Sequence, residues 1–286
     1  MINQHEKITI YSAQKSGKTL WGHLRDIRNE LPQAHELGLR LFQRNLRATY
    51  RQSFLGFLWV LLPPLMTAAL WIFLKASGVI KTNVAGLPYT LFVLIGIMLW
   101  QIFTEALLAP IQMVNQNKAM LSKINIPREG LILACFYEQA FNLFIKILVI
   151  GLALLLFWQP VSVMGIGLAL LGTAITCAAG LSIGLFVTPI GMLYQDVTRT
   201  ISIILPFLMY LSPIVYDKPK SGLMAQLMPF NPMAVMITQT RQWFTAQHVS
   251  ITPIFIVYTL LFLLLLFFSL IVYRLAMPMI IERMGS

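Results

Sequence analysis

One phosphate-binding signature is present in the sequence, the tripeptide Gly17-Lys18-Thr19, which resembles the end of a nucleotide-binding loop. Such a loop requires a glycine five positions before Gly17, because its backbone N–H groups wrap around the phosphate. Ser12 occupies that position, and the roughly 50 residues before the first long apolar run are too few for a nucleotide-binding fold. We therefore interpret the tripeptide as part of a polar tail. Any ATP that the protein uses is expected to bind a separate chain.

The other residues that commonly perform catalysis or bind metals lack the spacing that either role requires. The ten carboxylates form no close pair in an apolar setting, and both cysteines lie in apolar stretches, where we expect buried thiols without a disulfide. We predict no catalytic residue, no metal site and no cofactor on this chain. The histidines and cysteines concerned are His5, His23, His35, His248, Cys135 and Cys177.

A few ionisable residues do lie inside long apolar runs, where they are costly and therefore indicate a role. Glu105 lies in one run, and Glu138 and Lys146 lie in another. Glu138, Asn142 and Lys146 follow one another at intervals of four, so they share one face of a helix. This stripe is predicted to face another helix or a water-filled path. Contact with a transported substrate and structural pairing between helices or subunits are both open interpretations.

The composition is that of an integral membrane protein. The chain is 58% hydrophobic and 11% charged, whereas a soluble domain has about 25% charged residues. The formal net charge is +11, and nine of the 21 Lys and Arg residues precede residue 55, ahead of any long apolar run. Cytoplasmic enrichment in basic residues explains this excess without nucleic acid. We predict no nucleic-acid partner.

Six apolar runs are candidate membrane spans, which need about 20 residues each, and the fifth of them is shorter than this. With the amino terminus inside, 15 basic residues fall in inside regions and five in outside regions, so we predict that both termini are cytoplasmic. The expected parts are a cytoplasmic region 1–53, a membrane domain 54–277 and a cytoplasmic tail 278–286. The predicted spans are 54–74, 89–114, 131–158, 161–193, 200–216 and 253–277.

Two further segments are predicted to be helices that do not cross the membrane. After Pro32, apolar residues recur at helical spacing beside four arginines, which is typical of a helix at the membrane interface, although packing on other protein is the alternative. Residues 217–252 contain two short apolar runs around Asn231-Pro232, which fit two short re-entrant helices or an ordinary outer loop. The arginines are Arg40, Arg44, Arg47 and Arg51.

The order of several short motifs resembles one transporter family. The stretch 44–59, RNLRATYRQSFLGFLW, is followed by Pro63-Pro64, then by Tyr194-Gln195-Asp196-Val197, Ser212-Pro213-Ile214 and Asn231-Pro232. This order is similar to that of the permeases of ABC type-2 polysaccharide exporters, which carry O-antigen, capsule or teichoic acid (the Wzm type). Gln195 stands where the family usually has a basic residue. The resemblance extends from residue 44 to about 276.

The resemblance implies a homodimeric permease of six spans per chain in the bacterial cytoplasmic membrane. Two ATPase subunits would bind ATP and Mg²⁺ and drive export of a lipid-linked glycan. The four arginines would lie on a gate helix that meets the lipid headgroup, and the segment 115–130 would couple to the ATPase. The implied coupling residues are Lys118, Met120, Leu121, Lys123 and Ile124, and the candidates for the translocation path are Trp59, Glu105, Glu138, Asn142 and Tyr210.

Three other functions remain compatible with the sequence. A type-2 permease for a small lipophilic drug or lipid would share the fold. An ion-coupled or proton-coupled carrier would use Glu105, Glu138 and Lys146 as a relay. A structural or assembly protein would show no substrate-dependent ATPase stimulation.

Overall fold

The computed structural model describes residues 20–51, 58–79, 86–123, 129–217, 221–222, 225–226 and 228–285. Every regular element in these ranges is a helix, so the predicted all-α fold is confirmed for them. In chain order the helices are α1 (Leu20–Arg51), α2 (Leu58–Ala76), α3 (Tyr89–Gln116), α4 (Lys118–Lys123), α5 (Glu129–Leu156), α6 (Val163–Leu193), α7 (Gln195–Tyr210), the 3₁₀ turn η1 (Met228–Phe230), α9 (Pro232–Phe244) and α10 (Pro253–Gly285).

Four of the described helices, α3, α5, α6 and α10, are long and apolar enough to cross a membrane. At ~1.5 Å per residue, the 28 residues of α3 reach about 42 Å, more than the ~30 Å hydrocarbon core of a bilayer. These helices correspond to the second, third, fourth and sixth predicted spans. The first and fifth correspond to the shorter helices α2, of 19 residues, and α7, of 16. A total of six crossings therefore stays a prediction.

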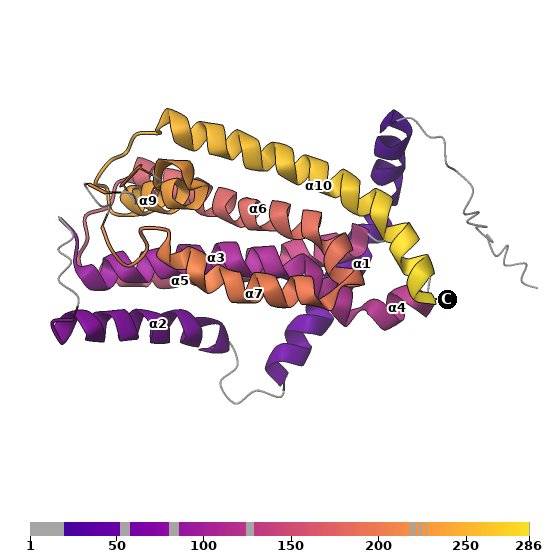
Figure 1. The fold of residues 1–286 in the computed structure, drawn as a ribbon, viewed down its shortest axis with the longest axis horizontal. Helices are drawn as coiled ribbons and strands as arrows, with labels where there is room; N and C mark the ends of the chain where they lie inside the picture. Colours follow the sequence, from indigo (N-terminus) through magenta and orange to yellow (C-terminus); the bar gives the residue numbers. More distant parts are fainter. Residues whose placement is uncertain are drawn as a thin grey trace, which may run out of the picture.

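The long helices lie roughly parallel along the longest dimension of the molecule, and α1 runs across one end of them (Figure 1). The short helix α4 and the carboxyl terminus lie at this end, which we call the α4 end. Helix α9 lies at the opposite end, which we call the α9 end (Figure 1). Helix α3 connects the two ends, because it begins at Tyr89 near α9 and is followed directly by α4.

The core of the bundle is built around α3, most of which is buried between α6, α5 and α2. Two glycines of α6, four residues apart, allow α3 and α6 to approach closely. A Cβ atom at Gly180 would lie 2.3 Å from the carbonyl oxygen of Phe103, and one at Gly184 would lie 2.2 Å from that of Leu107. Small residues at this spacing are characteristic of helix pairs that pack in membranes.

Several helices expose apolar faces that no other part of the described chain covers. Only 17% of the most apolar window of α10 is buried, and the outer faces of α2, α5 and α7 are exposed as well. Water would penalise such a surface, whereas lipid does not. Examples of these exposed side chains are Met66 and Phe73 of α2, Leu152 and Leu155 of α5, Ile203 and Phe207 of α7, and Leu260 and Leu264 of α10.

The structure alters three predicted boundaries. Helix α7 ends at Tyr210, and residues 211–216 form a turn, buried at residues 212–215, instead of the last part of the predicted fifth span. Pro213 has no N–H to donate and therefore favours this break. Helix α10 continues past residue 277, so most of the predicted tail 278–286 is helical. Helix α1 begins before Pro32 and is continuous through it, although the helix predicted here was expected only after Pro32.

Candidate coupling and entrance site

Helix α1 is held on the bundle by one face, which packs on α5. Ala34 and Leu41 are buried there, and Gly38 lies so close that a Cβ atom would be 2.9 Å from the Cβ of Leu133. The His35 ring nitrogen Nδ1 and the Tyr137 hydroxyl lie 2.5 Å apart and add a polar contact. The sequence left open whether this segment packs on protein or lies at the membrane interface. For this face of α1, packing on protein is confirmed, and the protein is helix α5 of the same chain. An interfacial position for the opposite face stays a prediction.

A polar cluster joins α1 to the junction of α3 and α4. The guanidinium of Arg44 donates to the side-chain oxygen of Asn117 at 2.7 Å, and Asn117 is the residue between α3 and α4. The Asn117 amide in turn donates to the Met113 carbonyl at 2.8 Å. The neighbouring Asn45 amide donates to Glu138 of α5 at 2.8 Å. A displacement of α4 would therefore be transmitted to α1 through the hydrogen bond between Arg44 and Asn117.

The basic residues of α1 point away from this packing face. Arg40 and Arg47 are exposed, and Arg40 forms an exposed ion pair with Glu36 at 2.6 Å. Arg44 is also exposed in part, although Asn117 and Asn45 accept hydrogen bonds from it. The side chain of Arg51 lies outside the described residues. The α4 end of the molecule therefore carries a positively charged strip, which we call the α1 basic face (Arg40, Arg44 and Arg47).

The predicted coupling segment forms a short helix, but its apolar residues are arranged differently from the prediction. Lys118 is exposed, Met120 is half-buried, and Leu121 is only 5% exposed because it packs within this chain. Leu121 therefore contacts its own chain in this arrangement, and its role in coupling stays a prediction. The side chain of Lys123 and all of Ile124 lie outside the described residues.

The ionisable residues of the long helices bind different partners. Lys146 of α5 is fully buried, and its ammonium lies 2.6 Å from a carboxylate oxygen of Glu105 on α3. Glu138 instead accepts its hydrogen bond from Asn45 at the α4 end. Asn142 lies between them on α5 and is half-buried. Pairing between helices therefore accounts for Lys146, which has no surface to offer a substrate in this arrangement.

The two aromatic candidates for the translocation path lie on exposed faces. Trp59 of α2 is 54% exposed and Tyr210 of α7 is 49% exposed. The Tyr210 ring lies 6.0 Å from that of Trp71, which brings α2 and α7 together. Neither residue forms a hydrogen bond, ion pair or ring contact with the α1 basic face among the described residues, so the structure does not gather the predicted site residues into one pocket.

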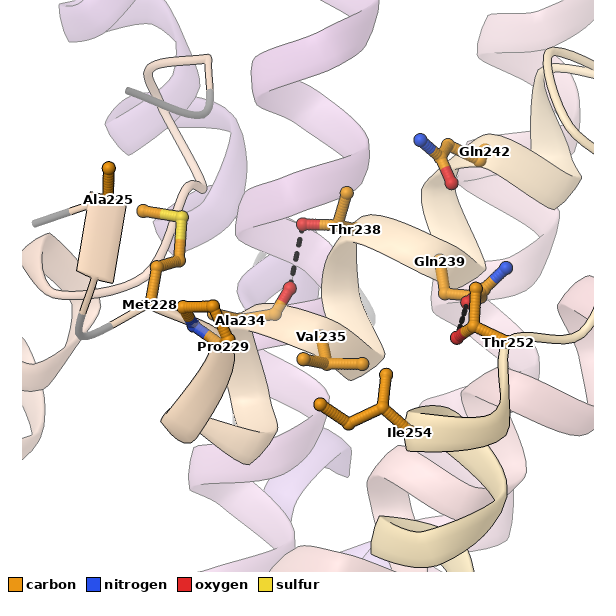
Figure 2. Close-up of a pocket in the computed structure, with 10 residues that line it drawn as sticks. All are labelled: Ala225, Met228, Pro229, Ala234, Val235, Thr238, Gln239, Gln242, Thr252 and Ile254. Atoms are coloured by element: carbon orange, nitrogen blue, oxygen red, sulfur yellow. Dashed lines mark hydrogen bonds between the residues drawn. The ribbon is translucent and has the colours of Figure 1, made fainter. Parts of the chain in front are cut away.

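A cavity of about 220 Å³ lies at the α9 end, at the opposite end of the molecule from the α1 basic face. Its walls are mainly apolar, and three of its polar side chains, those of Thr238, Gln239 and Thr252, form hydrogen bonds within the chain. Thr238 donates to the Ala234 carbonyl, and Thr252 donates to the Gln239 side chain (Figure 2). The Gln239 amide also donates to Ser250. None of the predicted site residues lines this cavity.

Three residues that join helices in the structure were not singled out from the sequence. Asn45 and Asn117 each stand beside a basic residue, Arg44 or Lys118, that was singled out for its charge, and Asn117 also follows a long apolar run. Arg241 was counted with an outer loop, yet it is 4% exposed on α9. Burial lowers the pKa of its guanidinium to about 9, against the raising effect of Asp217. Arg241 is therefore still charged at neutral pH.

The described residues hold no group of three or more His, Cys, Asp or Glu side chains that could bind a metal ion.

Residues 37–245, which run from α1 through α9, match the sequence profile of the family described as ABC-2 type transporter. This chain belongs to that family. The ABC-2 membership and the four long apolar helices together make it a multi-pass membrane protein of a transporter family.

Curated ABC-2 relatives carry a more specific name. An "O-antigen export system permease protein RfbA" from Myxococcus xanthus is 26% identical over 218 residues, which cover 73% of this chain and 80% of the relative. A protein of the same name from Klebsiella pneumoniae is 24% identical over 207 residues, which cover 70% of this chain and 77% of the relative. A second Klebsiella pneumoniae protein of that name gives the same identity and coverage.

Proposed function

We propose that this chain is the permease subunit of an exporter that moves a lipid-linked polysaccharide of the O-antigen type across the bacterial cytoplasmic membrane. The names of the three curated relatives carry this proposal. A separate ATPase subunit would bind ATP and Mg²⁺, and this chain would perform no catalysis. Family membership supports the ATPase partner, because ABC transporters are driven by nucleotide-binding subunits.

The proposed topology has six crossings, by α2, α3, α5, α6, α7 and α10, with the α4 end in the cytoplasm. The excess of basic residues in the predicted inside regions supports this orientation. Helix α9 would enter the outer leaflet without crossing. Its 13 residues span about 20 Å, too short for the hydrocarbon core, and it is buried against α6, α3 and α10. A buried short helix of this kind is tolerated at membrane depth.

The proposed partners fit two different surfaces. A second copy of the chain would cover the exposed aromatic and apolar faces of α2 and α7, which include Trp59, Phe207 and Tyr210. The ATPase would dock at the α4 end, where Lys118 is exposed and Met120 is partly accessible. The hydrogen bond from Arg44 to Asn117 would then pass motion of α4 to α1.

The α1 basic face would receive the anionic headgroup of the lipid-linked glycan. Arginine forms strong, often bidentate hydrogen bonds with phosphate oxygens. Arg40 and Arg47 are exposed enough to make such bonds, and the salt bridge of Arg40 with Glu36 lies on the surface, where it adds little stability and can be exchanged. Arg44 would also connect α1 to the junction of α3 and α4, because Asn117 accepts a hydrogen bond from it.

Replacing Arg40, Arg47 and Arg51 together by glutamine is expected to reduce export of lipid-linked glycan at least about tenfold, since each lost charge-assisted bond to phosphate weakens binding. Export is measured as surface polysaccharide in cells, and assembly is measured as co-purification with the ATPase, which should be unchanged. The matched control replaces the same three residues by lysine, which keeps the charge and should retain most of the export. Full export by the glutamine variant would contradict the headgroup role of this face.

A further inference from the structure

The turn that follows α7 is an unusual piece of irregular backbone. Helix α7 exposes most of its surface. Among the described side chains of α7, Leu205 is the one apolar side chain that is almost fully buried. The next residues reverse this pattern, because Ser212, Ile214 and Val215 are between 0% and 3% exposed. An exposed helix is thus attached to a buried, non-helical turn. Buried backbone outside a helix must find hydrogen-bond partners elsewhere.

Every backbone carbonyl from Tyr210 to Val215 accepts a hydrogen bond, and five of these six bonds come from four side chains. The backbone N–H of Ile214 donates to the carbonyl of Ser212 at 2.7 Å. The side-chain donors are the Tyr216 hydroxyl to Tyr210 (2.8 Å), the Asn231 amide to Leu211 (3.2 Å), the Arg241 guanidinium to Pro213 (3.0 Å) and Ile214 (3.3 Å), and the Tyr89 hydroxyl to Val215 (2.9 Å).

Apart from Tyr216, which belongs to the turn, the side-chain donors come from two other elements. Tyr89 begins α3, whereas Asn231 caps the start of α9 and Arg241 lies near the end of α9. The oxygen of the Asn231 side chain accepts from the backbone N–H groups of Met233 and Ala234, so this one residue connects the start of α9 to the turn. Both ends of α9 and one end of α3 therefore donate hydrogen bonds to four of the six carbonyls.

Arg241 is the centre of this arrangement. Its guanidinium lies 3.5 Å from the centroid of the Phe92 ring on α3, a cation–π contact, while its N–H groups point to the two turn carbonyls. Gly96, one helical turn after Phe92, leaves the space that this contact requires. A Cβ atom there would lie 2.7 Å from the carbonyl oxygen of Ile214 and 3.1 Å from a guanidinium nitrogen.

We propose that Arg241, Asn231 and Tyr89 are positioning residues that fasten the α9 end of helix α7 to α3 and α9. This end of α7 has little other attachment, since Phe207 and Tyr210 are both exposed and the ring contact of Tyr210 with Trp71 buries only part of Tyr210. At its other end, α7 is joined to α6 through the single extended residue Tyr194. The fastened end then moves together with α3 and α9, and displacement of α7 during transport occurs at the Tyr194 end.

The test uses the full chain in lipid nanodiscs and follows hydrogen–deuterium exchange of backbone amides by mass spectrometry. Arg241→Met removes two donors to the turn, and we expect exchange in residues 205–216 to become at least about tenfold faster. Tyr89→Phe removes one hydroxyl and is expected to accelerate the same residues about fivefold. Arg241→Lys keeps the charge without the planar fork and should fall between wild type and Arg241→Met.

Two matched variants separate positioning from general loosening. Tyr258→Phe also removes a tyrosine hydroxyl that donates to a backbone carbonyl, that of Pro229, at 2.9 Å, but it does not contact the turn. Gln242→Met changes the residue next to Arg241 on α9. Both should leave exchange in 205–216 at the wild-type rate. Tyr89→Phe retains all ring contacts, so it decides the question if Arg241→Met fails to fold.

Unchanged exchange in residues 205–216 in Tyr89→Phe would overturn the proposal. Equal acceleration in α5 and α10 would overturn it as well, because that result would show a general loss of stability. The measurement needs neither ATP nor glycan, so its outcome is independent of the proposed substrate.

Discussion

Glu105→Gln is expected to lower the free energy of unfolding by about 3 kcal/mol, because it leaves the buried ammonium of Lys146 without a charged partner. Lys146 is fully buried, whereas the Glu105 side chain is 37% exposed. Lys146→Met should therefore cost less than Glu105→Gln, since the carboxylate that remains can still be solvated. Unfolding can be followed by tryptophan fluorescence during titration of mixed micelles with denaturing detergent.

The double variant Glu105→Gln/Lys146→Met provides the control. It removes both charges and should recover most of the stability, to within about 1 kcal/mol of wild type, because a buried ion pair and an uncharged pair of similar volume often have comparable stability. If the two single effects simply add in the double variant, the side chains do not form the pair described here. This result would also reopen the relay of a proton-coupled carrier.

Gly184→Ala is predicted to destabilise the packing of α3 on α6 by about 3 kcal/mol, which is at the upper end of the usual cost of overpacking. The new Cβ atom would lie 2.2 Å from a backbone carbonyl oxygen, that of Leu107, and backbone cannot move aside as a flexible side chain can. The change is measured as the detergent concentration at the midpoint of unfolding. Export should fall in parallel if the contact between α3 and α6 is needed in the working transporter.

Helix α6 contains a matched control for this substitution. A Cβ atom at Gly167 would meet nothing within 4 Å. Gly167→Ala should therefore be neutral or slightly stabilising, since alanine favours the helix over glycine. Equal losses at Gly167 and Gly184 would show that helix flexibility, and not the contact with α3, determines the effect.

The long helices could be predicted from the sequence because each depends on a local property, an apolar run of sufficient length. The partner of Lys146 could not be predicted in this way. Spacing along α5 suggested a stripe with Glu138 and Asn142, but the rotation of α5 against α3 brings Lys146 to Glu105 instead. That rotation follows from packing across the whole bundle, which no local pattern contains.

The same limit explains the differences at the two ends of the molecule. The burial of Leu121 could not be predicted because α4 was considered alone, whereas the rest of the chain covers it. The fifth span was predicted to reach residue 216 because residues 211–216 are mostly apolar. The side chains that allow this turn to be buried, Arg241 and Asn231, follow it by about 20 to 30 residues, so their effect could not be read from the turn itself.

The most direct test of the account is the ATPase rate of the complex between this chain and its ATPase subunit, purified in lipid, with and without undecaprenyl-linked glycan. Stable co-purification and a rate that rises on addition of the lipid-linked glycan, but not of undecaprenyl phosphate alone, are the predicted results. A rate that rises only with small lipophilic compounds, or the absence of any complex, would contradict the proposed polysaccharide export.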